Sequence, residues 1–495
     1  MSFVSSNFFI FLGIFGACYF LAPQRLRWFV LLVSSYVFYW FVGGGFAVAI
    51  ISGTIFTVYI SGVLAGALRE LKADRFVRRL PLALCLTLNF GLLLILILDG
   101  HVAHRFALFL IPGVSFYTFQ AAGYLIDIYR GKIVPERNIL RVALFLSFFP
   151  QLVQGPISRH SEISSDLFAG HDWDWERSRR GVLRIIWGYF MWVVIANRAA
   201  PIVNTVFANY SNYGGAIIVF GVLMYTIQIY SDFAGGIYIA LGIAEILGIS
   251  LPKNFRQPFF ATSLADFWRR WHMTLTRWLR DYLFYPIAMS KPLSKLGKSS
   301  RRIFRGRAGK MLAPSVATFC VYIVIGVWHG AGAQIILFGL LNGTLITASL
   351  YFEPQIAQLR VITGINGDGR GKAFAMLRTF ALLMFLRYFA RAESLPHALR
   401  MLRQTVSDFR AYELWDATVL NLGVGANGYI VLAFGLVFLL ASDIISEKGI
   451  DWREKLIGAN PVLQFSVLFV SLALITIFGI YAGDTLSANF IYAAH

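Results

Sequence analysis

The sequence predicts an all-α polytopic membrane protein, and three observations indicate this class. Of the 495 residues, 58% are hydrophobic and only 14% are charged, whereas soluble globular chains have about 45–50% apolar and about 25% charged residues. Apolar runs recur along the chain, and they reach or approach the length of about 20 residues that a helix needs to cross the hydrocarbon core of a membrane. Basic residues gather between these runs. Together these features exclude a soluble enzyme, a coiled coil and a disordered chain.

Roughly eleven or more apolar runs are predicted to be membrane spans, although several are short. Residues 106–130 and 254–287 are also apolar but are broken by Pro, Gly and charge. Backbone of this kind lies at membrane depth only where it is buried in protein or lines a water-filled cavity. We therefore expect re-entrant or interfacial helices there, around a hollow interior. The predicted spans are 8–22, 28–42, 46–68, 80–98, 182–196, 215–230, 313–327, 334–352, 374–389, 429–442 and 462–481.

The charge distribution predicts the orientation in the membrane. The chain has 44 basic and 25 acidic residues and a net charge of +19. The basic residues lie in short loops, so the expected partners are anionic lipids at the cytoplasmic face and not nucleic acid. Residues 69–79 hold five basic residues, and residues 291–310 hold eight basic and no acidic residues. Both segments are predicted to be cytoplasmic, with the N-terminus outside.

Three parts are expected along the chain. Residues 1–105 form N-terminal spans, residues 106–400 form a core with re-entrant and interfacial helices, and residues 401–495 form C-terminal spans and a tail. The first run has no basic segment before it and no convincing cleavage site, so it is expected to be a retained membrane segment. The three cysteines lie in apolar runs without metal-ligand spacing. No metal site and no bound cofactor are expected.

His329 is the strongest single candidate for chemistry. It lies in the segment GVWHGAG between two apolar runs, and ionisable groups inside membrane segments are costly and are candidates for function. The neighbouring glycines remove side-chain bulk, so a ligand can approach the ring closely. An imidazole with a pKa near 6.5 suits a general base at neutral pH. The alternative is a neutral ring that is hydrogen-bonded to a helix backbone.

Residues 266–286, DFWRRWHMTLTRWLRDYLFYP, have the period of an amphipathic helix. We expect one interfacial helix, with an aromatic face in lipid or protein and a basic face toward headgroups or an anionic ligand. His272 lies between the two faces, either as a structural residue or as a second polar group beside His329. The apolar face comprises Phe267, Trp271, Leu275, Trp278 and Tyr282, and the basic face comprises Arg269, Arg270, Arg277 and Arg280.

Four polar residues, Gln120, Asp127, Gln151 and Gln154, have apolar surroundings. Each must find hydrogen-bond partners, because an unpaired polar group is costly to bury. Contacts between helices are the simpler interpretation for most of them.

Several stretches, in the same order along the chain, resemble the membrane-bound O-acyltransferase family, in its bacterial branch of alginate O-acetyltransferases and teichoic-acid D-alanyltransferases. The resemblance runs from about residue 8 to the C-terminus. The tryptophan–histidine segment and the WHG segment are its most specific parts. The ARAESLPHAL segment at 390–399 and the NFIY near the C-terminus are similar to the longer acetylase group. The matching stretches are 115–130, 148–159, 230–236, 251–259, 266–286 and 326–330.

This resemblance implies an enzyme with no bound cofactor that moves an acyl group across the membrane. The donor is a cytoplasmic thioester, acetyl-CoA or an acyl carrier protein. The acceptor is a hydroxyl of an extracytoplasmic cell-surface polysaccharide, reached directly or through an extracytoplasmic acetyltransferase. His329 is implied to be the catalytic histidine and His272 the second conserved histidine, in a central funnel that a thin layer closes near His329. The implied location is the bacterial plasma membrane.

Two other functions stay open at this point. Length and tail favour acetyl transfer, but D-alanyl transfer to teichoic acid fits the same motifs. A lipid or polysaccharide transporter without covalent chemistry fits the many spans and the intramembrane polar groups. No internal repeat of the kind that transporters usually show is found in the sequence.

Two further sets of residues carry hypotheses. Lys298, Arg301, Arg302 and Arg305 belong to the basic segment, which either attracts an anionic donor or is an ordinary anchor at the cytoplasmic face. Tyr492 matches the tyrosine that is thought to accept the acyl group in relatives, although the last three residues, Ala-Ala-His, depart from the family pattern. It is interpreted as an acyl relay or as an interfacial anchor.

Overall fold

The computed structural model describes residues 3–102, 111–304, 306–362 and 369–481. In this part of the chain every regular element is a helix, and no strand occurs. The chain divides into two compact units. The first comprises Asp232–Lys253 and the described parts of Met1–Val194 and Asp451–Ala494, and the second comprises Ile195–Ser231 and the described part of Asn254–Ile450. Two elements, η3 (Phe190–Ala196) and α10 (Gly215–Ile246), have residues in both units.

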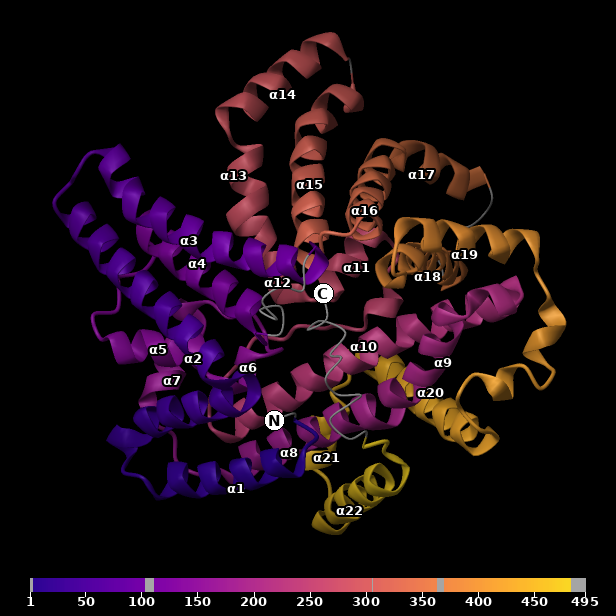
Figure 1. The fold of residues 1–495 in the computed structure, drawn as a ribbon, viewed down its shortest axis with the longest axis horizontal. Coiled ribbons are helices and arrows are strands. Elements are labelled where there is room, and N and C mark those ends of the chain that lie inside the picture. Colours follow the sequence, from indigo (N-terminus) through magenta and orange to yellow (C-terminus); the bar gives the residue numbers. More distant parts are fainter. Residues whose placement is uncertain (1–2, 103–110, 305, 363–368, 482–495) are drawn as a thin grey trace. The chain divides into compact units, whose positions relative to one another are not determined.

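The first unit is organised around its longest helix, α2, which packs against α3, α4 and α5 (Figure 1). A cluster of phenylalanine rings from α1, α2 and α6 fills part of its core, with Phe8, Phe38 and Phe149 fully buried. The helices lying wholly in this unit are α1 (Ser6–Leu21), η1 (Gln24–Leu26), α2 (Arg27–Glu70), α3 (Arg75–Val102), α4 (Val114–Arg130), α5 (Ile139–Ser147), α6 (Phe149–Leu152), α7 (His160–Ala169), α8 (Trp175–Tyr189), α21 (Trp452–Ile457) and α22 (Pro461–Phe478).

Glycines let α8 and the second half of α10 approach closely within this unit. A Cβ atom at Gly235 would lie 2.8 Å from the carbonyl oxygen of Gly188, and one at Gly242 would lie 2.5 Å from that of Gly181. On each helix the two glycines are seven residues apart and therefore share one face. Small residues on facing helices allow the backbone contact that drives helix association in membranes.

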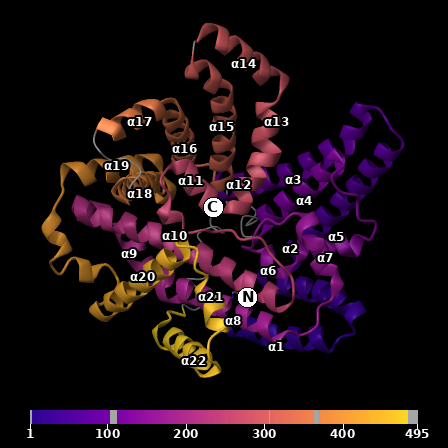
Figure 2. The same cartoon turned by 180° about the vertical axis from the view of Figure 1, so that it is seen from behind.

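The second unit contains a helical hairpin of α15 and α16, with α14 packed on α15 and α18 packed on α16 (Figure 2). A Cβ atom at Gly339 would lie 2.4 Å from the carbonyl oxygen of Tyr322, so glycine is needed where these helices cross. The helices lying wholly in this unit are α9 (Asn197–Ala208), η4 (Tyr210–Asn212), η5 (Pro258–Phe260), α11 (Leu264–Arg270), α12 (Met273–Leu279), η6 (Arg280–Phe284), α13 (Tyr285–Ala288), α14 (Lys291–Ile303), α15 (Arg307–His329), α16 (Ala333–Tyr351), α17 (Glu353–Ile362), α18 (Gly369–Arg391), α19 (Leu395–Ser407), η7 (Ala411–Leu414), η8 (Val419–Asn421) and α20 (Ala426–Glu447).

Nine helical segments in the described residues are long and apolar enough to cross a membrane. Ten of the runs predicted as spans fall on these segments, because Gln24–Glu70 contains two of them, although 334–352 and 462–481 extend slightly past the ends of their helices. The remaining run corresponds to α1, which has only 16 residues. The predicted all-α polytopic membrane fold is confirmed. The number of spans, the central funnel and the division into three parts stay predictions.

The three residues between the predicted spans 28–42 and 46–68 form a kink inside α2. At this kink Gly44 has φ 71° and ψ −176°, a region of backbone conformation that is essentially open only to glycine. The two predicted spans, 28–42 and 46–68, are therefore the two arms of one bent helix.

Substituting Gly44 with alanine is expected to destabilise the protein by about 1–3 kcal/mol, because the new Cβ atom would be held in a strained backbone conformation. Gly53 is a matched control in the same helix. It has helical geometry and open space around it, so Gly53→Ala is expected to be neutral or to stabilise by up to about 1 kcal/mol. Thermal unfolding in detergent measures both variants, and equal midpoints would contradict the strained kink.

Candidate functional site

His329 is the last residue of α15 and is half-buried. The helix stops there because the next residue, Gly330, has φ 148°, a conformation that favours glycine. The chain then turns through Gly332 and begins α16. Gly326 lies one turn before His329, and a Cβ atom there would come within 3.2 Å of the carbonyl oxygen of Ile335. The glycines around His329 therefore serve the turn and the close packing of α15 on α16.

A single indole ring contacts both candidate histidines. The centroid of the Trp328 ring lies 4.5 Å from that of His329 and 6.3 Å from that of His272, within the usual range for aromatic contacts. The structure therefore brings together the two histidines that the sequence singled out, although they are far apart along the chain.

The predicted amphipathic helix over 266–286 is broken in the structure, so the expectation of one continuous helix is wrong. Helix α11 ends at Arg270, and α12 begins at Met273. His272 lies between them with φ 44° and ψ 53°, in the left-handed region. Apolar periodicity correctly identifies the buried face, because Phe267, Trp271, Leu275, Trp278 and Tyr282 are all buried.

Asn254 holds the start of α12 and the ring of His272. Its backbone carbonyl oxygen accepts a hydrogen bond from Met273 N (2.9 Å). Its side-chain Oδ1 accepts from Thr274 N (3.0 Å) and from the Thr274 hydroxyl (2.8 Å). The same Oδ1 lies 3.2 Å from Nδ1 of His272. The first amides of a helix have no hydrogen-bond partner within the helix. In α12 the partner is Asn254, which lies 20 positions before Thr274.

These contacts determine which nitrogen of His272 carries the proton. Oδ1 can only accept hydrogen bonds, so Nδ1 of His272 must be the donor, and the lone pair lies on Nε2. The side chain is 1% exposed, and burial lowers the pKa of the imidazole from 6.5 to about 3. His272 is therefore neutral at physiological pH. It is suited to accepting a hydrogen bond through Nε2 but is a weak general base, because catalytic bases work best with a pKa near the operating pH.

The predicted basic face is only partly free to meet headgroups. Arg269 is exposed, whereas Arg270 is largely buried and pairs with Asp266 (3.1 Å) and Glu447 (2.7 Å). Arg270 therefore connects α11 to α20 and does not present its charge to a headgroup or ligand. This part of the expectation is wrong because a carboxylate 177 positions away neutralises the guanidinium.

The basic segment is a helix rather than a loop. Lys298, Arg301 and Arg302 are exposed on α14, at spacings that place them on one face. Arg305 and Tyr492 lie outside the described residues. Like charges spaced four apart destabilise a helix by a few tenths of a kcal/mol, so Lys298 and Arg302 slightly weaken α14.

The four polar residues of the apolar stretches lie in the first unit and are all buried. Gln151 donates to the carbonyl oxygen of Phe145 (3.2 Å), and Asp127 lies 3.7 Å from Nζ of Lys132. Among the described residues neither amide atom of Gln154 has a hydrogen-bond partner. Its carboxamide lies against Gly236 of α10, where a Cβ atom would come within 2.0 Å of Oε1.

Comparison with known proteins identifies the family. The chain is 31% identical to the protein named probable alginate O-acetylase of Pseudomonas aeruginosa over 451 residues, which are 88% of this chain and 81% of that protein. The model of the membrane-bound O-acyltransferase family matches residues 133–377. The chain belongs to the membrane-bound O-acyltransferase family. Family membership decides between the two classes that the sequence left open, since this protein is a membrane acyltransferase and not a transporter without covalent chemistry.

Two other relatives of this acyltransferase modify different polymers, according to their names. The peptidoglycan O-acetyltransferase of Helicobacter pylori is 29% identical over 319 residues, covering 59% of this chain and 56% of that protein. The teichoic acid D-alanyltransferase of Bacillus subtilis is 29% identical over 264 residues, covering 51% of this chain and 62% of that protein. The matched family region contains both histidines and Trp328.

Sequence reasoning missed two residues of this acyltransferase that the structure makes prominent. Asn254 belongs to a segment quoted for the resemblance, but nothing local shows that it caps α12. Asp232 of α10 is buried, and its Oδ2 has no hydrogen-bond partner among the described residues. An acidic residue inside an apolar run is itself a signal of function, so Asp232 could have been found from the sequence.

The buried, neutral state of His272 predicts how stability depends on pH. The unfolded imidazole has an ordinary pKa of 6.5, and the folded one has a pKa of about 3. Between these values the unfolded state binds more protons, so stability is complete above about pH 6.5 and falls by up to about 1.4 kcal/mol per pH unit as the pH decreases toward 3.

Thermal unfolding in detergent between about pH 7.5 and 5 tests this expectation. The midpoint of the native protein should fall on acidification more steeply than that of His272→Gln, which cannot titrate. An identical pH dependence of the two proteins would mean that His272 is not held neutral by the fold.

Proposed function

We propose that this acyltransferase transfers an acetyl group from a cytoplasmic thioester, acetyl-CoA or an acyl carrier protein, to a hydroxyl of an extracytoplasmic cell-surface polysaccharide. The single observation that carries the proposal is the grouping of His329, Trp328 and His272 at the end of α15. Both imidazoles contact the indole of Trp328, and the tautomer of His272 is set by Asn254. The cell membrane of a bacterium is the proposed location, with α14 on the cytoplasmic side.

In the proposed reaction His329 acts as the general base. Its imidazole removes the proton from the attacking hydroxyl as the oxygen bonds to the thioester carbonyl carbon. The tetrahedral intermediate then collapses, the carbon–sulfur bond breaks, and the thiolate takes the proton from the imidazolium. His272 contributes a fixed hydrogen-bond acceptor, Nε2. This nitrogen can orient a hydroxyl group, or a water molecule hydrogen-bonded to the thioester carbonyl, while the imidazole stays neutral. The last proton transfer returns His329 to its neutral form, so the cycle can repeat, and no step oxidises or reduces a reactant.

Acetyl is favoured over D-alanyl by the extent of the similarity. The probable alginate O-acetylase aligns with 88% of this chain, whereas the teichoic acid D-alanyltransferase aligns with 51%. The name of the peptidoglycan relative also specifies an acetyl group on a glycan. The likeness to the alginate relative favours a polysaccharide acceptor, reached directly or through an extracytoplasmic acetyltransferase. Acyl relay through Tyr492 stays part of this proposal and rests on the sequence alone.

Replacing His329 with glutamine is expected to lower kcat by about 10²–10⁴-fold with little change in KM for the donor, because the amide cannot accept a proton. Acetyl transfer by purified protein in lipid nanodiscs, given labelled acetyl-CoA and an acceptor polysaccharide, measures both constants. The thermal midpoint of the variant shows whether it is folded. Normal acetylation by folded His329→Gln would remove this histidine from the mechanism.

Helix α14 is proposed to attract the anionic donor. Changing Lys298, Arg301 and Arg302 to glutamate should raise KM for acetyl-CoA by about tenfold at low salt, and less at high salt, because exposed charges are screened beyond about 8–10 Å. Reversal of two exposed arginines on α19, Arg400 and Arg403, is the matched control. Altered abundance or orientation with unchanged KM would instead assign α14 to anchoring.

A further inference from the structure

The second unit contains an apolar pocket that the proposed reaction does not use. It has a volume of about 570 Å³ and lies between the first half of α15, the second half of α16 and the start of α17. Arg307 begins α15 and lines this pocket, whereas His329 ends the same helix. The 22 residue steps between them correspond to roughly 33 Å along the helix axis. The pocket is therefore separate from the candidate catalytic site.

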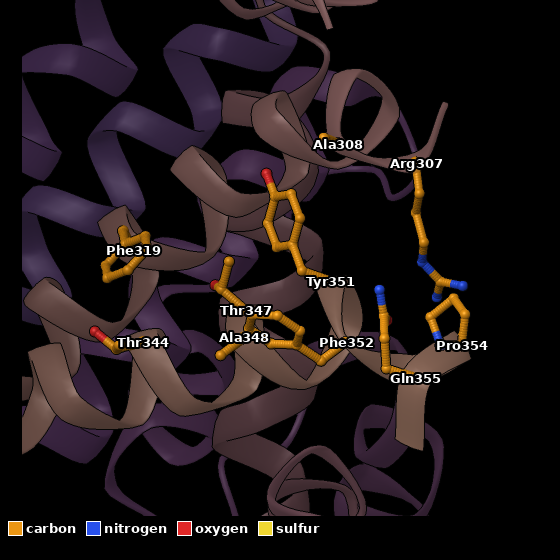
Figure 3. Close-up of a pocket in the computed structure, with 10 residues that line it drawn as sticks. All are labelled: Arg307, Ala308, Phe319, Thr344, Thr347, Ala348, Tyr351, Phe352, Pro354 and Gln355. Atoms are coloured by element: carbon orange, nitrogen blue, oxygen red, sulfur yellow. The ribbon is translucent and has the colours of Figure 1, made fainter. Parts of the chain in front are cut away.

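The pocket is apolar along its length and charged at one end. Phe319, Ala348 and Phe352 form apolar walls. Figure 3 shows Arg307 and Gln355 together on one side of the pocket, with Phe319 and Thr344 on the opposite side. A ligand that fits such a lining has a hydrocarbon part and an anionic head.

The guanidinium of Arg307 has hydrogen-bonding capacity to spare. Its Nη2 pairs with Glu353 at the start of α17. Among the described residues its Nε has no hydrogen-bond partner. Both partners of this ion pair are partly exposed, and exposed pairs contribute only about 0–1 kcal/mol. A phosphate can therefore share or replace this contact and form the paired hydrogen bonds that guanidinium groups make with phosphates.

The surroundings of the charged end match a membrane interface. Helix α14 leads into α15 and carries Lys298, Arg301 and Arg302 without an acidic residue in the helix. The exposed apolar side chains of Ile303, Phe304 and Phe352 lie at the same end of the α14–α15–α16 group. Apolar side chains beside a run of positive charge are typical of a cytoplasmic membrane surface that contacts anionic lipid.

We propose that this pocket binds an anionic phospholipid of the cytoplasmic leaflet. An acyl chain lies along Phe319 and Phe352, and the phosphate is held by Arg307. Glu353 limits the affinity, because its carboxylate competes with the phosphate for the same guanidinium. The proposal is independent of which acyl group or acceptor the enzyme uses.

Native mass spectrometry after exchange into mixed phosphatidylglycerol and phosphatidylcholine tests the proposal. The unaltered protein should retain phosphatidylglycerol in preference to phosphatidylcholine. Arg307→Gln and the pocket-filling Ala348→Phe should each reduce retained phosphatidylglycerol by about tenfold, about 1.4 kcal/mol. Glu353→Gln should increase retention, because it removes the competing carboxylate.

Matched controls separate the pocket from general surface charge and size. Arg302→Gln removes an exposed arginine of α14, and Ser349→Phe adds a ring to α16, yet neither residue lines the pocket. Both controls should retain phosphatidylglycerol like the unaltered protein. Equal retention of the two lipids, or equal loss in pocket and control variants, would overturn the proposal.

The thioester donor is the competing occupant, since it also joins phosphate to a flexible chain. If the pocket binds lipid, coenzyme A should not displace phosphatidylglycerol from the protein. The KM for acetyl-CoA, measured in phosphatidylcholine nanodiscs, should also be the same for Ala348→Phe as for the unaltered protein. Displacement by coenzyme A together with a raised KM would assign the pocket to the donor and would contradict the lipid assignment, while leaving the role proposed for His329 intact.

Discussion

One carboxamide oxygen, Oδ1 of Asn254, fixes the position of His272 in the candidate site. It accepts from the backbone and side chain of Thr274 and from the imidazole of His272. These contacts provide hydrogen-bond partners for the first amides of α12, hold His272 in a left-handed conformation and leave its lone pair on Nε2. Positive φ for a non-glycine residue is uncommon and persists where surrounding contacts impose it. The contacts of Asn254 therefore stabilise the break between α11 and α12, and this break places the ring of His272 beside Trp328.

The division of labour between the two histidines follows from their surroundings. His272 is almost completely buried, and its low pKa keeps it neutral, so it can act only as an acceptor that stays in place. His329 ends a helix at a glycine turn and is half-buried, so it is more exposed than His272. A buried neutral imidazole and a half-buried imidazole that both contact one indole are a suitable arrangement for the proposed acyl transfer to a hydroxyl.

Much of this architecture was predictable from local sequence, and the remainder depends on distant contacts. Apolar run length predicts the long helices, and an isolated histidine within apolar surroundings points to His329. Periodicity also identifies the buried face of 266–286, but it cannot show that the helix breaks at His272, because the capping group comes from Asn254. Local sequence also cannot show that Arg270 pairs with Glu447, because the two residues are 177 positions apart. A prediction from the charge of Arg270 alone therefore places its side chain wrongly at the membrane surface. The kink at Gly44 is a similar case. The three glycines at 43–45 indicate a bend, but they do not show whether the helix continues through it.

Solid-state nitrogen-15 NMR of the histidine-labelled protein in lipid can show whether the fold holds His272 neutral with its proton on Nδ1. His272→Gln assigns the signal by its disappearance. We expect a protonated Nδ1 and an unprotonated Nε2 at about pH 7, with no change down to about pH 5, well above the folded pKa. A signal that titrates near pH 6.5, or a proton on Nε2, would contradict it.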